Sequence, residues 1–228
     1  MNETTLFVNV LGGNSSRKST KVDCLFNYIR KHAEKFEKIP YGYIMTYNGI
    51  NYCFIGKFFK DILMGLDSRP FGKKAGVNSY ENKLKTYEKI IKEYNPYFIM
   101  TEGYFNNWGS FQYECLENIK KYGFTGYRYF YHLFDSFEEQ VKNIRTRNEV
   151  YETYLDRSKH HYFYLTKTIE KFKKEVRDGN DVVVQKVSPF VENDYYVKFF
   201  FNTEFPEYKI KNSNDGDLSD FYWDVSTN

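Results

Sequence analysis

Hydrophobic positions along the chain follow two spacings in turn, one typical of buried strands and one typical of amphipathic helices. Short, nearly continuous apolar runs predict strands at residues 5–11, 97–103, 127–134 and 182–187. Apolar residues three and four positions apart predict helices at about 18–36, 79–94, 110–121 and 154–177, and another from 137 onward. Because strands and helices alternate, the sequence predicts an α/β fold with a mostly parallel sheet and helices on both of its faces.

Two further strand-like runs, residues 41–47 and 52–58, flank the dipeptide Asn48-Gly49. Asn-Gly between alternating apolar runs is the strongest short signal for a β-hairpin. A loop rich in Gly and Asp is expected to follow at residues 60–78. The hairpin and this loop are therefore expected to form an insertion at about residues 40–78.

The C-terminal part of the chain differs from the rest in charge. Residues 190–228 carry eight acidic and three basic side chains, a net charge of −5, which leaves +8 on residues 1–189 of the total of +3. We expect residues 1–189 to form one domain, followed by a strand at 195–201 and an acidic tail. A basic domain suits a polyanionic partner such as nucleotide phosphates or a nucleic-acid strand, whereas an acidic tail is usually a solvated end.

The chain is rich in aromatic residues, with 23 Tyr and 22 Phe. These can supply stacking surfaces for bases, or they can reflect A/T-rich codon usage, and the second explanation carries more weight. No run of about 18 apolar residues predicts a membrane span, and residues 1–10 lack the pattern of a secretory signal. The widely spaced Cys24, Cys53 and Cys115 predict reduced thiols without a zinc site. We therefore expect a cytoplasmic protein.

The first strand leads into a loop of small residues that ends where a helix begins. Residues 12–13 are both glycine, and Lys18-Ser19-Thr20 opens the helix. In such a loop backbone N–H groups can surround phosphates, with the lysine as a point charge and a hydroxyl as a ligand of Mg²⁺. The phosphate-loop pattern has glycine where this chain has Arg17, which costs about 1 kcal/mol if that position needs a positive φ. In ordinary helical geometry the guanidinium would lie near the phosphates. The alternative is a plain strand-to-helix turn with Lys18 in solvent.

Two other groups of polar residues fit the same site. Glu102 ends a buried strand, and since the carboxyl ends of parallel strands meet at one edge of a sheet, we expect it to face Lys18. There it could hold Mg²⁺ through water or accept the proton of a substrate hydroxyl; the alternative is a local ion pair. Arg145, Arg147 and Arg157 bracket a polar segment that we expect to act as a lid, neutralising charge on a transferred phosphoryl group. The alternative is helix-end arginines in solvent.

Three segments carry a resemblance to a known family: LFVNVLGGNSSRKST at residues 6–20, the strand-end TEG at 101–103, and FDSFEEQVKNIRTRN at 134–148. Over about residues 5–187 the chain resembles the P-loop kinases of the nucleoside and nucleotide monophosphate kinase type. The resemblance implies a three-layer sandwich, bound ATP and Mg²⁺, and a lid at about 145–157. The residues that would contact the ATP are Gly12, Gly13, Asn14, Ser15, Ser16, Arg17, Lys18, Ser19, Thr20 and Arg157. Ser19 and Glu102 would hold the metal.

A second resemblance concerns the insertion. A hairpin followed by Gly65-Leu66-Asp67 is similar to the phage-encoded kinases that phosphorylate 5-hydroxymethyluridine within DNA. By that likeness Asp67 would orient the substrate hydroxyl and Arg69 would lie near a phosphate. A base within a duplex would have to be flipped out to reach the site. The alternative is an ordered loop whose Asp caps a turn.

These observations together predict an ATP-dependent kinase. Its catalytic residues would be Lys18, Glu102, Asp67, Arg145 and Arg147. The acceptor would be nucleoside-like, and among such acceptors we favour the hydroxymethyl group of a modified pyrimidine in DNA. A phage-encoded enzyme would act in the host cytoplasm. One alternative is a kinase of free deoxynucleosides or deoxynucleoside monophosphates. Another is a non-catalytic nucleotide- or DNA-binding module with a degenerate loop.

Overall fold

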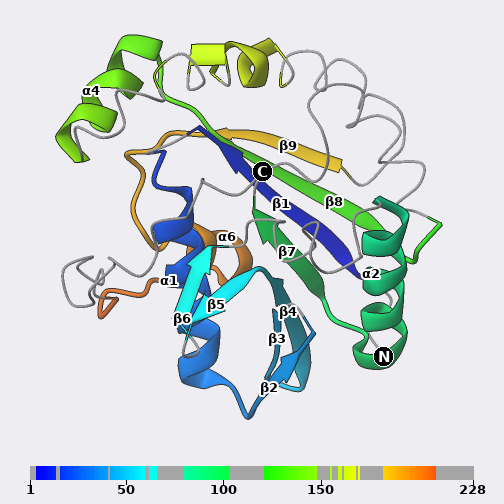
Figure 1. Ribbon diagram of the computed structural model, residues 1–228. Helices are drawn as coiled ribbons and strands as arrows, with labels where there is room; N and C mark the ends of the chain where they lie inside the picture. Colours follow the sequence, from blue (N-terminus) through cyan, green and yellow to red (C-terminus); the bar gives the residue numbers. More distant parts are fainter. Residues whose placement is uncertain are drawn as a thin grey trace.

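A computed structural model describes residues 4–13, 16–40, 42–59, 62–65, 80–102, 121–147, 155, 159–160, 162–167, 169 and 182–208. Seven strands form one sheet in the order β2-β3-β4-β7-β1-β8-β9 (Figure 1). They are β1 (Leu6–Gly12), β2 (Lys35–Ile39), β3 (Gly42–Tyr47), β4 (Ile50–Ile55), β7 (Phe98–Glu102), β8 (Gly126–His132) and β9 (Val182–Val187). The named helices are α1 (Lys18–His32), α2 (Tyr80–Tyr94), α4 (Phe137–Arg147) and α6 (Tyr195–Phe201).

The sheet is mixed but mostly parallel. β1 pairs in parallel with β7 on one side and with β8 on the other, β4 continues the parallel pairing beyond β7, and β9 continues it beyond β8. Only β2-β3 and β3-β4 are antiparallel pairs within it. The chain passes from β1 to strands beyond β7, and from β7 across β1 to β8, so the strand order reverses around β1. In open α/β sheets ligands bind outside the carboxyl ends of the strands at such a point.

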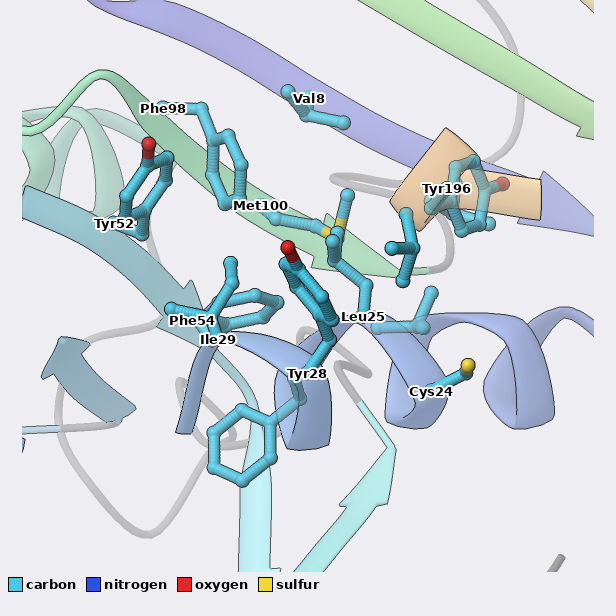
Figure 2. Close-up of a cluster of buried hydrophobic side chains, with 14 of the residues drawn as sticks. Val8, Cys24, Leu25, Tyr28, Ile29, Tyr52, Phe54, Phe98, Met100 and Tyr196 are labelled. Carbon is cyan, nitrogen blue, oxygen red and sulfur yellow. The ribbon is translucent and has the colours of Figure 1, made fainter. Parts of the chain in front are cut away.

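Helices cover both faces of this sheet, as the alternating sequence pattern predicts. Leu6, Val8 and Val10 of β1 belong to a core that includes the apolar residues of α1 and α6. Phe7 and Leu11, which point the other way, belong to a second core with α2 and with helical residues of the segment 162–169. Figure 2 shows part of the first core, where side chains of β1 and β7 face those of α1. Two cores on opposite faces make the domain three layers thick.

Residues 35–39 depart from the sequence prediction, which extended the first helix to residue 36. α1 ends at His32, and Ala33 has extended backbone angles (φ −68°, ψ 132°). The following residues form β2, whose Phe36 ring stacks on the Tyr43 ring of β3 with a centroid distance of 4.7 Å and an interplanar angle of 14°. Aromatic pairs across neighbouring strands stabilise a sheet. Pairing with β3 therefore overrides the helical spacing of these residues.

The predicted hairpin is confirmed. Tyr47 at the end of β3 pairs with Ile50 at the start of β4, so the turn contains only Asn48 and Gly49. Both have positive φ, 52° and 69°, which is the geometry of the type I′ turn that Asn-Gly favours. The insertion continues with β5 (Lys57–Phe59) paired antiparallel to β6 (Ile62–Gly65). The prediction of a loop throughout residues 60–78 is therefore wrong for residues 62–65.

Residues 195–201 form α6, so the predicted C-terminal strand is also wrong. The rings of Tyr195, Tyr196, Phe199 and Phe200 all have their centroids 5.0–6.4 Å from that of Phe130 in β8. Residues at positions i, i+1, i+4 and i+5 share one face of a helix, whereas successive residues of a strand point to opposite faces. Packing four rings around Phe130 therefore requires a helix, although aromatic residues favour strands in general.

Several sequence predictions concern residues outside the described ranges. They are the short helix at 110–121, most of the helix at 154–177, and the polar tail after residue 208. Within the described residues, no helix has both the length and the apolar character needed to cross a membrane.

Candidate functional site

The carboxyl ends of three neighbouring strands meet at one edge of the sheet. The register aligns Val10 of β1 with Glu102 of β7, and Gly12 of β1 with His132 of β8. α1 begins at Lys18, after the N-cap residue Arg17, and its first turn contains no acidic residue. A helix N-terminus carries unpaired N–H groups and a partial positive charge. The start of α1 therefore adds a partial positive charge to this edge of the sheet, which suits an anion.

Glu102 contacts both residues that the sequence places beside it. Its Oε1 lies 3.3 Å from Nζ of Lys18, and the Ser19 hydroxyl donates to Oε1 at 2.9 Å and to Oε2 at 3.1 Å. Glu102 is buried, with 5% of its surface exposed. A buried carboxylate is stable only with such partners. The structure thus brings a lysine and a hydroxyl from adjacent positions to a carboxylate more than 80 residues later in the chain.

At the junction of β1 and the loop before α1, the packing is so tight that Gly12 and Gly13 have no room for a side chain. A Cβ on Gly12 would lie 2.8 Å from the carbonyl oxygen of His132 and 2.6 Å from Oγ of Ser16. A Cβ on Gly13 would lie 2.4 Å from Nε2 of Gln140 in α4. The loop backbone therefore packs closely against the end of β8 at Gly12 and against the Gln140 side chain at Gly13, and glycine permits both close approaches.

Ser16 adds an unused polar group to this loop. It is 1% exposed, and its Oγ has no hydrogen-bond partner among the described residues. A buried hydroxyl without a partner costs free energy. A ligand oxygen bound in the loop would supply the missing partner.

Arg17 adopts a left-handed backbone, with φ 55° and ψ 17°. The position therefore has the positive φ for which glycine is the least costly residue. Its guanidinium carbon lies 5.7 Å from the centroid of the Phe190 ring, within the range of a cation–π contact. This is not the right-handed geometry in which the sequence argument placed the guanidinium near bound phosphates.

Two basic residues of the site were not identified from the sequence. Lys21 is fully buried, its Nζ donates to the Pro189 carbonyl at 2.9 Å, and burial together with the charge of Arg17 lowers its pKa to about 8. His132 is also fully buried, and its Nε2 lies 2.6 Å from the Tyr196 hydroxyl oxygen. Burial and the charges of Lys21 and Lys18 hold the pKa of His132 well below its usual value, so the ring is neutral.

The sequence contained a signal for each of these two residues. His132 ends a predicted strand at the same edge of the sheet as Glu102, and the same argument applies to both. Lys21 follows Lys18 by three positions and so shares its face of the helix. No comparable signal marks Gln140, whose contact with the loop depends on how α4 packs.

α4 begins with a reciprocal capping arrangement. The Ser136 hydroxyl accepts a hydrogen bond from the backbone N–H of Glu139 at 3.1 Å, and the Glu139 carboxylate accepts one from the N–H of Asp135 at 3.2 Å. This agrees with the predicted helix from residue 137 onward and resembles a capping box. Arg145 is exposed near the other end of α4, and Arg147 is the last residue of the helix.

The structure does not place every residue predicted for the site. Thr20 lies in the first turn of α1, and its carbonyl accepts a hydrogen bond from the Tyr208 hydroxyl at 3.3 Å. The predicted residues that lie outside the described ranges are Asn14, Ser15, Asp67, Arg69 and Arg157. Within those ranges, no cluster of three or more His, Cys, Asp or Glu side chains could hold a metal ion. A metal at Ser19 and Glu102 would need its other ligands from water and substrate, as Mg²⁺ commonly does.

The fold and this site define an α/β protein with a mostly parallel sheet, flanking helices and a candidate anion site at the carboxyl ends of its strands. The sequence matches no family model, no curated protein and no solved structure. The case for a function therefore depends on the residues of the site.

Proposed function

We propose that this protein binds ATP with Mg²⁺ and transfers a phosphoryl group to a nucleoside-type acceptor. The observation that carries the proposal is the contact of Glu102 with both Lys18 and Ser19 at the N-terminus of α1. These are the three side-chain types that phosphoryl transfer uses to hold phosphates and a divalent cation. The unpartnered Ser16 hydroxyl supports a loop that binds phosphate oxygens.

Each residue has a separate role in this proposal. Lys18 and the backbone N–H groups of residues 12–20 bind the β- and γ-phosphates, and Ser19 with Glu102 orients Mg²⁺. Bound Mg²⁺·ATP supplies the phosphoryl group together with a metal that offsets charge on its oxygens. With nucleotide bound, Lys18 would contact phosphate in place of the Glu102 carboxylate, and Glu102 would then be available to the metal or to the acceptor hydroxyl.

The other predicted residues complete the proposed reaction. Asp67 or Glu102 would orient the acceptor. Arg145 and Arg147, with Arg157, would stabilise charge on the transferred group. These assignments come from the sequence, and the exposed position of Arg145 near the end of α4 is compatible with a lid.

For the acceptor we favour the hydroxymethyl group of a modified pyrimidine in DNA over a free nucleoside or nucleotide. The net charge of +8 on residues 1–189 supports a polyanionic partner. The strands β5 and β6 extend the hairpin insertion between β4 and α2, where the resemblance places acceptor-binding residues. A module that binds nucleotide or DNA without catalysis is the second candidate, and the left-handed Arg17 in place of glycine favours it.

A transfer assay separates these functions. Purified protein is incubated with γ-labelled ATP, Mg²⁺ and a panel of nucleosides, nucleotides and hydroxymethylated DNA. Label in the DNA supports the proposal, and label in a free nucleoside or nucleotide supports the alternative kinase. Binding of ATP without transfer to any acceptor would support the non-catalytic module. DNA binding that is salt-sensitive and indifferent to ATP would indicate a DNA-binding structural protein.

The variant Lys18→Ala tests the assignment of the loop. We expect transfer to be lost while the unfolding transition shows an intact fold. Lys89→Ala is the matched control, because Lys89 is an exposed lysine of α2 on the opposite face of the sheet. Activity that survives in Lys18→Ala would mean that the phosphate site is wrongly assigned.

A further inference from the structure

Three cations gather at the first turn of α1. Arg17 is the N-cap residue, Lys18 begins the helix, and Lys21 follows three residues later. Residues three and four positions apart lie on the same helix face, so Lys21 neighbours both of the others. Like charges at this spacing repel one another, and cations near a helix N-terminus are unfavourable. Glu102 offsets the charge of Lys18, but the arrangement as a whole lowers stability unless a further negative charge is present.

Lys21 is the most unfavourable of the three because its side chain is fully buried. Its one described hydrogen bond goes to a neutral acceptor, the Pro189 carbonyl after β9. From β8 it faces His132, which is neutral and bonded to Tyr196 of α6. Glu102 of β7 is engaged by Lys18 and Ser19. Within the described part of the chain, no carboxylate pairs with Lys21.

A buried ammonium without a carboxylate is costly, and replacing a buried charge by an apolar residue often stabilises a protein. We propose that Lys21 is a second phosphate-site cation, whose charge acts together with that of Lys18 on a bound polyphosphate chain. This inference depends on the proposed function, because it adds a residue to the same site. The long side chain of a helical residue leans toward the helix N-terminus, which directs Lys21 toward the loop that precedes α1.

The competing interpretation is structural. Lys21 could simply attach α1 to the segment after β9 through its hydrogen bond to Pro189. The two interpretations require different chemical properties of the side chain at position 21. A structural role needs a hydrogen-bond donor of the right length, whereas the proposed role needs the positive charge.

The experiment compares Lys21→Met, which removes both charge and donor, with Lys21→Gln, which removes the charge and keeps a donor. Lys89→Met is the control on an exposed lysine. Binding of tripolyphosphate and of orthophosphate is measured by calorimetry at pH 7 and fixed ionic strength, and stability by urea unfolding. A charge-assisted contact predicts about tenfold weaker tripolyphosphate binding in both Lys21 variants, and a smaller loss for orthophosphate. The unfolding midpoint of Lys21→Met should equal or exceed that of the wild type.

Each other outcome argues against the inference. Affinity retained in Lys21→Met, or restored in Lys21→Gln, would show that the charge is not used. Equal loss for both anions would do the same, because the charge should favour the longer chain. If the wild type binds tripolyphosphate and the variants match it, only the role of Lys21 fails. If the wild type binds no polyphosphate, the proposed function fails along with it.

Discussion

Replacing Arg17 by glycine should give a more stable protein than replacing it by alanine. The backbone at this position is left-handed, with φ 55° and ψ 17°. This geometry costs an L-residue about 1–2 kcal/mol, and the greater freedom of glycine in the unfolded chain offsets about 0.4–1 kcal/mol of the gain. Both variants lose the contact with Phe190, so it cancels in the comparison. The glycine variant should therefore be more stable by roughly 0.5–1 kcal/mol.

Urea unfolding at equal m-values measures this difference. With a slope of about 2.5 kcal/mol per molar urea, the midpoints should differ by about 0.3 M. The same pair of substitutions at Lys89, an exposed position inside α2, should reverse the order, because glycine costs about 1 kcal/mol relative to alanine within a helix. An alanine variant at position 17 that equals or exceeds the glycine variant would refute the left-handed loop geometry and the argument that a glycine position is occupied by arginine.

Three further predictions concern the same region. The free energy of unfolding should rise by about 2 kcal/mol between pH 7 and 9.5, because the pKa of Lys21 is about 8 in the folded protein against an ordinary value of 10.5, so the folded state loses this proton first. Urea unfolding across this pH range should show the rise in the wild type and not in Lys21→Met. Gly12→Ala should lose about 1–3 kcal/mol in the same assay, because its Cβ would meet the rigid backbone carbonyl of His132, and an unchanged midpoint would rule out that close approach. Gly13→Ala meets only the end of the Gln140 side chain, so the double variant with Gln140→Ala should lose less stability than the sum of the single changes, and additive losses would contradict the contact.

The sequence predicts the elements whose signals are local. The turn at Asn48-Gly49 follows from the backbone preferences of two residues, and the start of α1 at Lys18 follows from the loop before it. The predictions for residues 35–39 and 195–201 are wrong for the opposite reason, because each element depends on a partner in another strand. β2 depends on the partner strand that offers the Tyr43 ring, and α6 depends on the Phe130 ring, which lies in a strand more than 60 residues earlier. The spacing of apolar residues within each segment does not identify either of these partner rings.

The same distinction applies to the site. Glu102 could be placed opposite Lys18 because parallel strands end at a common edge, and this needs only the fold class. The burial of Lys21 could not be foreseen, because it depends on the segment around Pro189 that covers α1. A lysine in a helix is normally a solvated residue, and only the tertiary structure shows the exception.

The central position of β1 has a consequence for how the protein is made. Leu6 pairs with Phe98 on one side and with Gly126 on the other, so both neighbours of this strand are synthesised long after it. At about 5–20 residues per second, an apolar strand with two open edges waits roughly 6–24 s on the ribosome for its second partner. Unpaired apolar edges are where chains associate with one another. We therefore expect the yield of native protein to depend on chaperones that shield this segment, and His132 to gain its hydrogen bond with Tyr196 only after α6 has docked.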